Sequence, residues 1–189
     1  MVVAILYTLA TQEHLHGDSM SAEERLDPAT GLYTRHFFGM LFNHEITRTH
    51  RYPSPLVLLR IATRYDMPPD DDKQRNTKAT MARMLFHNLR QVDVPAQFGD
   101  DYLVLLPATD EKGGATVGNR LLQRLQSEYP SQSGESQSMA IHIGMAAHSG
   151  GPDASAEAIL VQASEALEEA RQRGMNSMVS FREITTLKL

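Results

Sequence analysis

Cysteine is absent from all 189 residues of the sequence. The chain therefore has no disulfide framework, no thiolate metal site and no cysteine nucleophile, and it fits a reducing, cytoplasmic setting. An excess of basic residues is also lacking, because the formal net charge is -5. A chain of this charge is poorly suited to sequence-independent binding of the polyanionic backbone of nucleic acid. Nucleic acid is therefore not an expected partner.

A hydrophobic run long enough to cross a membrane is missing as well. The apolar segment Met1–Ala10 falls short of the roughly 20 residues that a bilayer requires, and no basic stretch precedes it. We therefore expect no membrane span. The polar stretch Thr11–Glu24 follows, broken by small and polar residues. Residues 1–25 are interpreted as an N-terminal extension or linker, and residues 26–189 as one domain.

Apolar residues recur at spacings that indicate alternating helices and strands. Helices are predicted over residues 35–50, 77–89, 110–129 and 154–173, and strands over residues 56–61, 139–146 and 178–184, with a hairpin over residues 94–107. The segment Met67–Asp72, with two prolines and three adjacent carboxylates, is predicted to be an exposed loop. Expected core residues are Phe38, Leu41, Leu58, Leu59, Leu85, Leu105, Leu106, Ile143 and Leu167.

The order of these elements predicts an α/β (α+β) fold. Strands interleaved with helices, together with one tight hairpin, are typical of a mixed sheet of about five strands flanked by helices. Ferredoxin-like and polymerase-palm domains have this arrangement. The N-terminal residues are expected to lie outside the core.

Four blocks of sequence resemble the GGDEF (diguanylate cyclase) family, in the family's order. Asp27–Arg35 resembles its D-x-L-T-G-L-x-N-R opening turn, and Gln97–Pro107 resembles its R-Y-G-G-D-E-F hairpin with the apolar strand that follows. Ile141–Ala146 is similar to the S-x-G-x-A strand, and Ala163–Asn176 to the A-D-x-A-L-Y-x-A-K-x-x-G-R-N helix. The resemblance implies the palm-type fold with its signature β-hairpin.

The residues that an active member would need for chemistry are altered. The resemblance implies carboxylates that hold divalent metal, a loop that reads guanine and cations that neutralise triphosphate. Ala62 stands where the family's D-x-D-x-F-K has its first metal carboxylate, and Arg64 adds a positive charge close by. The guanine-reading loop is replaced by the shorter segment Pro68–Arg75. We therefore expect a chain that is not an enzyme and holds neither metal nor cofactor.

The signature hairpin is only partly retained. Gly99, Asp100, Asp101 and Tyr102 remain, but one glycine of the pair is lost and Gln97 replaces the family's arginine. We interpret the two aspartates as a polar tight turn rather than a catalytic pair.

The last block keeps one of the two basic residues that would contact the triphosphate. Arg171 is a residual phosphate contact in place of the family's lysine, whereas the second basic position is Met175. His142 lies within a predicted strand and is interpreted as a partly buried structural residue rather than a base.

Arg90–Asp93 is an R-x-x-D placed just before the hairpin, where the resemblance implies the inhibitory site that binds product. An arginine can donate two parallel bonds to guanine or phosphate and can stack on the base, while Asp93 can accept from guanine N1 and N2. Arg120, in the following helix, could contribute a second arginine from a neighbouring subunit. The alternative is a surface salt bridge between Arg90 and Asp93, one helical turn apart, with Arg120 solvated.

Three functions stay open on the sequence alone. The working hypothesis is a catalytically inactive signalling domain that binds cyclic di-GMP through Arg90 and Asp93. The second is a nucleotide-independent module for interaction with a protein partner or for homodimerisation. The third is a residual diguanylate cyclase, which would need Asp100 and Asp101 to hold metal without a carboxylate at position 62.

Overall fold

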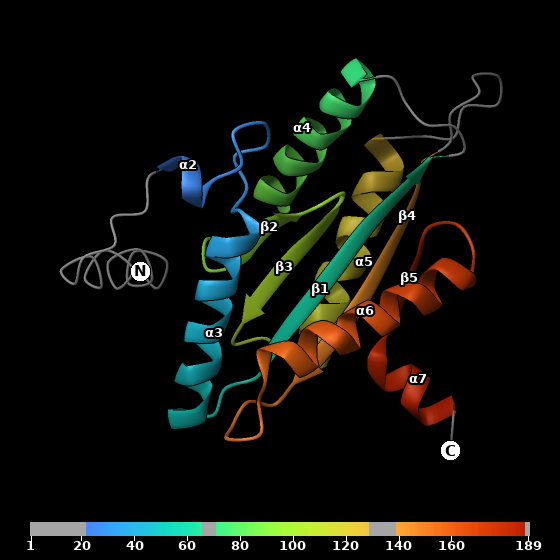
Figure 1. Ribbon diagram of the computed structural model, residues 1–189. Coiled ribbons are helices and arrows are strands. Elements are labelled where there is room, and N and C mark those ends of the chain that lie inside the picture. Colours follow the sequence, from blue (N-terminus) through green and yellow to red (C-terminus); the bar gives the residue numbers. More distant parts are fainter. Residues whose placement is uncertain (1–21, 66–70, 129–138, 188–189) are drawn as a thin grey trace.

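The structure is a computed structural model that describes residues 22–65, 71–128 and 139–187 (Figure 1). Its elements run in the order α2 (Ala22–Arg25), α3 (Arg35–Arg51), β1 (Leu56–Tyr65), α4 (Asp71–Asn88), β2 (Val94–Phe98), β3 (Asp101–Pro107), α5 (Glu111–Glu128), β4 (Met139–His148), α6 (Ala156–Gln172), β5 (Ser177–Ser180) and α7 (Phe181–Leu187). No helix in these ranges is long and apolar enough to cross a membrane.

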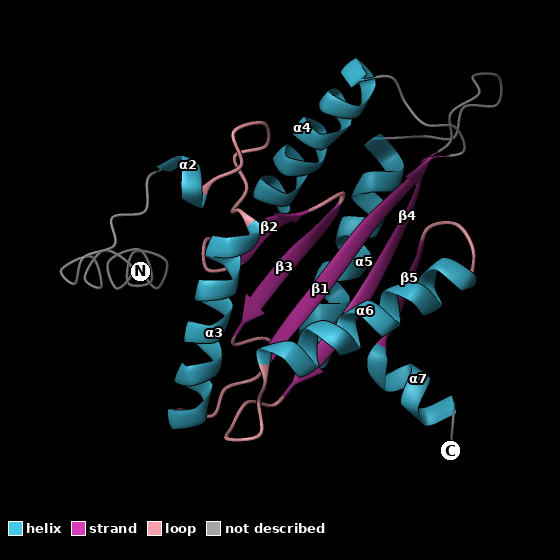
Figure 2. Cartoon of the chain, viewed as in Figure 1, coloured by secondary structure: helices cyan, strands magenta, loops and turns pink. Residues whose placement is uncertain are grey.

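The strands form one five-stranded sheet in the order β2-β3-β1-β4-β5. All neighbouring strands are antiparallel except β4 and β5, which are parallel. Figure 2 shows α6 crossing the near side of the sheet, with α5 behind it. This mixed sheet flanked by helices confirms the predicted fold class.

The core has two main clusters, one on each face of the sheet, because successive strand residues point to opposite sides, and a small third cluster of Ala166, Ala170 and Val179. On one face Leu59 and Ile61 of β1 pack with residues of α4 and α5. On the other face Leu58 packs with residues of α3 and α6. Since helices cover both faces, β1 reads as a nearly continuous apolar run. All the predicted core residues are buried except Leu41, which is partly buried against the second cluster.

Gly144 allows helix α6 to lie directly against strand β4. A Cβ atom at this position would fall 2.2 Å from the Ala163 carbonyl oxygen and 2.3 Å from the Leu167 backbone nitrogen. These are backbone atoms, so no side-chain movement could make room for it. The glycine of the S-x-G-x-A strand therefore has a packing role.

The opening turn ties α3 to the edge of the sheet. Asp27 Oδ1 accepts hydrogen bonds from the backbone N–H and the hydroxyl of Thr30. Tyr33 then forms a bridge with Ala96 of β2, and Thr34 caps the start of α3 through the Phe37 N–H. The block of sequence with the most specific resemblance is thus structural. The domain boundary after residue 25 stays a prediction.

Two predicted segments were wrong in part. The strand predicted over residues 178–184 ends at Ser180, and Phe181 begins helix α7. The Ser180 N–H donates to Glu183 Oε1 at 3.3 Å, as in a capping box, and this S-x-x-E pattern marks a helix start. The predicted loop over residues 67–72 ends early, because α4 begins at Asp71, where acidic residues favour the helix dipole. Residues 66–70 lie outside the described residues.

Candidate functional site

An ion pair between Arg60 and Asp101 lies at the hairpin end of the sheet, on the face covered by α6. The two residues come together because β1 and β3 are antiparallel, with Ile61 opposite Tyr102. Arg60 Nη2 and Nε donate to Asp101 Oδ2 at 2.6 and 3.0 Å, and Arg60 Nη1 donates to Ser164 Oγ of α6 at 2.8 Å. Both of the charged side chains are largely covered. The Asp101 carboxylate is therefore already neutralised by a guanidinium.

Ala62 occupies the strand position next along this face, opposite His142 of β4. It is 1% exposed, and its methyl group offers no metal ligand. Within the described part of the chain, no three His, Asp or Glu side chains gather in a way that could hold a metal ion. The residues present thus do not fit a divalent metal site of the carboxylate type.

Arg171 of α6 adds a second cation beside Asp101. Its Nη2 lies 3.6 Å from Asp101 Oδ1, and its Nη1 bonds to Glu168 Oε1.

His142 is buried beneath these groups. Burial lowers the pKa of His142, the positive charges of Arg171 and Arg64 lower it further, and a hydrogen bond with the backbone of Ala170 partly opposes the shift. This region therefore favours the neutral form of His142 over its charged form.

The two aspartates of the hairpin contact opposite helical layers. Asp100, at the turn, is highly exposed and pairs with Lys78 of α4 at 3.3 Å. Asp101 pairs instead with Arg60 of β1 and with Arg171 of α6. Two carboxylates directed in this way do not converge on one metal ion. Tyr102, the next residue, is 1% exposed and belongs to the core.

Arg90 and Asp93 lie in a tight turn between α4 and β2. The Asp93 N–H donates to the Arg90 carbonyl at 3.0 Å, and the Arg90 N–H donates to Asp93 Oδ2 at 2.7 Å. The carboxylate thus binds the Arg90 backbone, and no ion pair joins the two side chains within the described residues. The expected alternative, a helical salt bridge one turn apart, is not what the structure has.

Asp93 is 6% exposed, and its Oδ1 atom is buried without a hydrogen bond among the described residues. Burial raises the pKa of Asp93, and the Arg90 N–H and the charges of Arg90 and Arg120 offset part of this shift. Arg120 Nη2 donates to the Asn88 carbonyl at 2.6 Å, so this arginine lies beside the same turn. The structure thus brings Arg90, Asp93 and Arg120 of one chain together.

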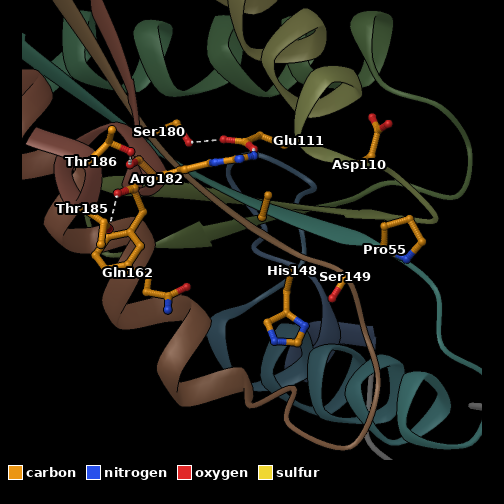
Figure 3. A pocket seen from close by; sticks show the side chains of 12 residues that line it. Pro55, Asp110, Glu111, His148, Ser149, Gln162, Ser180, Arg182, Thr185 and Thr186 are labelled. Atoms are coloured by element: carbon orange, nitrogen blue, oxygen red, sulfur yellow. Dashed lines mark hydrogen bonds and ion pairs between the residues drawn. The ribbon is translucent and has the colours of Figure 1, made fainter. Parts of the chain in front are cut away.

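A separate cavity of about 570 Å³, which the sequence did not indicate, lies between the start of α5, the end of β4 and α7. Figure 3 shows Glu111, Ser180 and Arg182 linked on one side of it, with His148 and Ser149 on another. Hydrogen bonds from Arg182 and Ser180 and the charge of Arg182 lower the pKa of Glu111, against the opposing effect of burial. Because Glu111 is fully occupied by these donors, we assign it a structural role.

The fold and the hairpin together define a palm-type α/β domain. A family model described as "Diguanylate cyclase, GGDEF domain" matches residues 79–177, which is more than half of the chain. The chain therefore belongs to the GGDEF family.

Curated relatives are similar over most of this chain. Diguanylate cyclase DosC of Escherichia coli (strain K12) is 28% identical over 160 residues, covering 82% of this chain and 34% of the relative. Diguanylate cyclase DgcP of Pseudomonas aeruginosa is 28% identical over 174 residues, covering 87% of this chain and 25% of the relative. The chain thus spans about a third or less of the length of these relatives.

Solved GGDEF domains share the fold. The GGDEF domain of FimX from Pseudomonas aeruginosa superposes with a TM-score of 0.68 at 18% identity, covering 82% of this chain and 98% of that one. The GGDEF domain of DgcB from Caulobacter crescentus, in complex with c-di-GMP, gives 0.72 at 13% identity, covering 88% and 99%. Diguanylate cyclase SiaD in complex with its activator SiaC, from Pseudomonas aeruginosa, gives 0.69 at 20% identity, covering 94% and 69%.

Proposed function

We propose that this chain is a catalytically inactive GGDEF domain that binds cyclic di-GMP through Arg90, Asp93 and Arg120. The observation that supports inactivity is the 2.6 Å contact between Arg60 and Asp101. A divalent cation at this place would compete with a fixed guanidinium for the carboxylate and would find only a methyl group at position 62. The triphosphate of GTP would then lack the metal on which phosphoryl chemistry of this kind depends.

Turnover measurements test this half of the proposal. With GTP and either Mg²⁺ or Mn²⁺, the chain should form no cyclic di-GMP above a control without protein. Ala62→Asp alone should not restore activity, because Arg60 still neutralises Asp101 and position 175 still lacks a cation. Formation of cyclic di-GMP by the unmodified chain would contradict the proposal. It would favour the alternative function, a diguanylate cyclase with residual activity.

The turn at Arg90–Asp93 offers the chemistry that cyclic di-GMP requires. Arg90 is exposed and, like Arg120, forms no ion pair with a carboxylate within the described residues. Either guanidinium can therefore bind a phosphate or the O6 and N7 atoms of guanine. Asp93 Oδ1 is a buried acceptor without a partner among the described residues, which costs about 1–3 kcal/mol, and guanine N1 and N2 would recover this cost if the turn moves to admit them. A related GGDEF domain, that of DgcB, was solved in complex with c-di-GMP.

Calorimetric titration with cyclic di-GMP tests the binding half. The unmodified chain should give a saturable heat, and Arg90→Ala should weaken binding about tenfold or more, which corresponds to about 1.4 kcal/mol. Asp93→Asn keeps an oxygen for the Arg90 N–H but removes the charge, so it should weaken binding without unfolding the turn. Arg83→Ala, an exposed arginine of α4 outside the site, is the control and should bind as the unmodified chain does. No saturable heat at roughly 100 μM ligand would contradict the proposal.

The second candidate function is a nucleotide-independent interaction module. It is favoured by one observation, that the solved neighbour SiaD is bound to a protein activator. If the chain is such a module, calorimetric titration should give no heat of binding with cyclic di-GMP and none with GTP plus Mg²⁺.

A further inference from the structure

Positive charge is concentrated in the two helices that cover one face of the sheet. Residues 73–92 and 112–127, most of which belong to α4 and α5, contain eight Lys and Arg residues and no Asp or Glu. The whole chain has 18 Lys and Arg against 23 Asp and Glu, so the remainder carries ten cations and all 23 acids. The acidic residues of α4 and α5 lie only at the helix ends. This layer is therefore basic on a chain whose other parts are strongly acidic.

Four arginines of this layer, Arg83, Arg90, Arg120 and Arg124, are exposed. Within the described residues, no carboxylate forms an ion pair with Arg83, Arg90, Arg120 or Arg124. Phe86 follows Arg83 by three residues on α4 and is 53% exposed, and Arg90 lies two residues beyond the end of this helix at Asn88. Residues three apart share a helix face, so Arg83 and Phe86 lie side by side on α4, and Arg90 extends this basic segment past the helix end. We call Arg83, Phe86 and Arg90 the basic stripe. Arginine and aromatic residues are the types enriched at protein interfaces.

Helix α6, on the opposite face of the sheet, carries a stripe of complementary character. Glu157, Val161 and Glu165 are spaced four residues apart, and Val161 is 50% exposed. Both glutamates are exposed, and no cation forms an ion pair with either of them within the described ranges. An apolar side chain with an acid before and after it along the chain thus complements, in the sign of the flanking charges, the aromatic side chain of Phe86 with an arginine before and after it.

We propose that the basic stripe Arg83–Phe86–Arg90 of one copy, together with Arg124, docks on the acidic stripe Glu157–Val161–Glu165 of α6 in a second copy of this chain. The contact would bury Phe86 against Val161 and would place each arginine near a glutamate. An isologous contact between two basic stripes is disfavoured because it brings like charges together.

A contact between two different patches leaves one basic and one acidic stripe free on every pair. Because the two stripes lie on opposite faces of the sheet, two copies joined by one such contact keep their remaining stripes turned away from each other, so association is head to tail and continues beyond two copies. Because charge complementarity drives it, association should weaken as salt rises. The basic stripe shares Arg90 with the proposed nucleotide site, but the test below changes Arg83 and Glu165, which lie outside the Arg90/Asp93 turn, so either proposal can fail without the other.

Sedimentation velocity on the full chain, without nucleotide, tests the contact by a charge swap. The unmodified chain at low salt should gain mass beyond a dimer as its concentration rises to roughly 200 μM, and it should return to monomer at about 0.5 M salt. Arg83→Glu and Glu165→Arg, each alone, should weaken association at least fivefold. An equimolar mixture of the two variants should associate again, since each supplies the stripe that the other has reversed.

Arg51→Glu, which reverses an exposed arginine at the end of α3, is the matched control and should associate as the unmodified chain does. A monomer at all concentrations would overturn the proposal and would leave a foreign acidic protein as the occupant of the basic stripe. Association that stops at a dimer, that survives Arg83→Glu, or that the mixture fails to restore would overturn it as well.

Discussion

Arg60 sets the electrostatics of the hairpin end of the sheet. It binds Asp101, donates to Ser164 of α6, and lies 5.2 Å from the centre of the Phe98 ring, over which Arg35 also lies at 4.5 Å. One guanidinium thus joins the hairpin, β1 and α6. The Arg60 guanidinium is a fixed cation beside the Asp101 carboxylate. The same ion pair therefore stabilises the hairpin and underlies the proposed loss of catalysis.

Replacement of Arg60 by Met should reveal how much this ion pair stabilises the fold. The side chains of Arg60 and Asp101 are 23% and 14% exposed, so the pair lies between the buried and the exposed classes, and we expect a loss of about 1–3 kcal/mol in urea unfolding. Lys78→Met removes the partner of the neighbouring Asp100, which is 86% exposed, and should cost less than about 1 kcal/mol. Equal losses of unfolding free energy for Arg60→Met and Lys78→Met would contradict the inference that the Arg60–Asp101 pair stabilises the fold more than the Lys78–Asp100 pair does.

His142 should make stability depend on pH. Its pKa in the folded chain lies below the ordinary value of 6.5, chiefly because of burial, so the unfolded chain takes up the proton first as the pH falls. The stabilising contribution is complete above the unfolded pKa and is lost as the pH falls through 6.5 toward the lower folded pKa. Urea unfolding between about pH 7 and 5.5 should show this slope, and His142→Ser should flatten it.

At the scale of elements, the hairpin turn depends on the backbone of Gly99, which has a φ of +65°. Gly99→Ala should destabilise the chain by about 1 kcal/mol, because a side chain disfavours this conformation. Gly39, within α3, has ordinary helical geometry and open space around it, so Gly39→Ala should stabilise by roughly 0.5–1 kcal/mol. Thermal unfolding measures both variants, and a shift of the same sign for both would contradict this account.

Periodicity in the sequence predicted most of these elements because each buries a regular apolar face. The hairpin and helices α3, α5 and α6 were placed within about two residues. Helix α7 was missed because Val179, Phe181 and Ile184 read as a continuing strand, although the pattern Ser180–Glu183 is a capping signal. The register that sets Arg60 beside Asp101 and the turn that directs Asp93 to the Arg90 N–H are tertiary features, which local spacing does not encode.

At the scale of the whole molecule, the two faces of the sheet differ in chemistry. The face under α6 carries Asp101 of the hairpin, beside which the guanidinium groups of Arg60 and Arg171 lie. The face under α4 and α5 carries the turn at Arg90–Asp93 and exposed arginines. Membership of the GGDEF family and these opposed faces together support our proposal that the domain binds a nucleotide on the face away from the Arg60–Asp101 pair.

Paired calorimetry tests the central claim most directly. One sample of the chain is titrated with cyclic di-GMP and a second with GTP plus Mg²⁺, under the same buffer and salt. The account predicts a saturable heat with cyclic di-GMP that Arg90→Ala weakens, and neither binding nor turnover heat with GTP plus Mg²⁺. Heat from GTP turnover, or no response to cyclic di-GMP at roughly 100 μM, would contradict it.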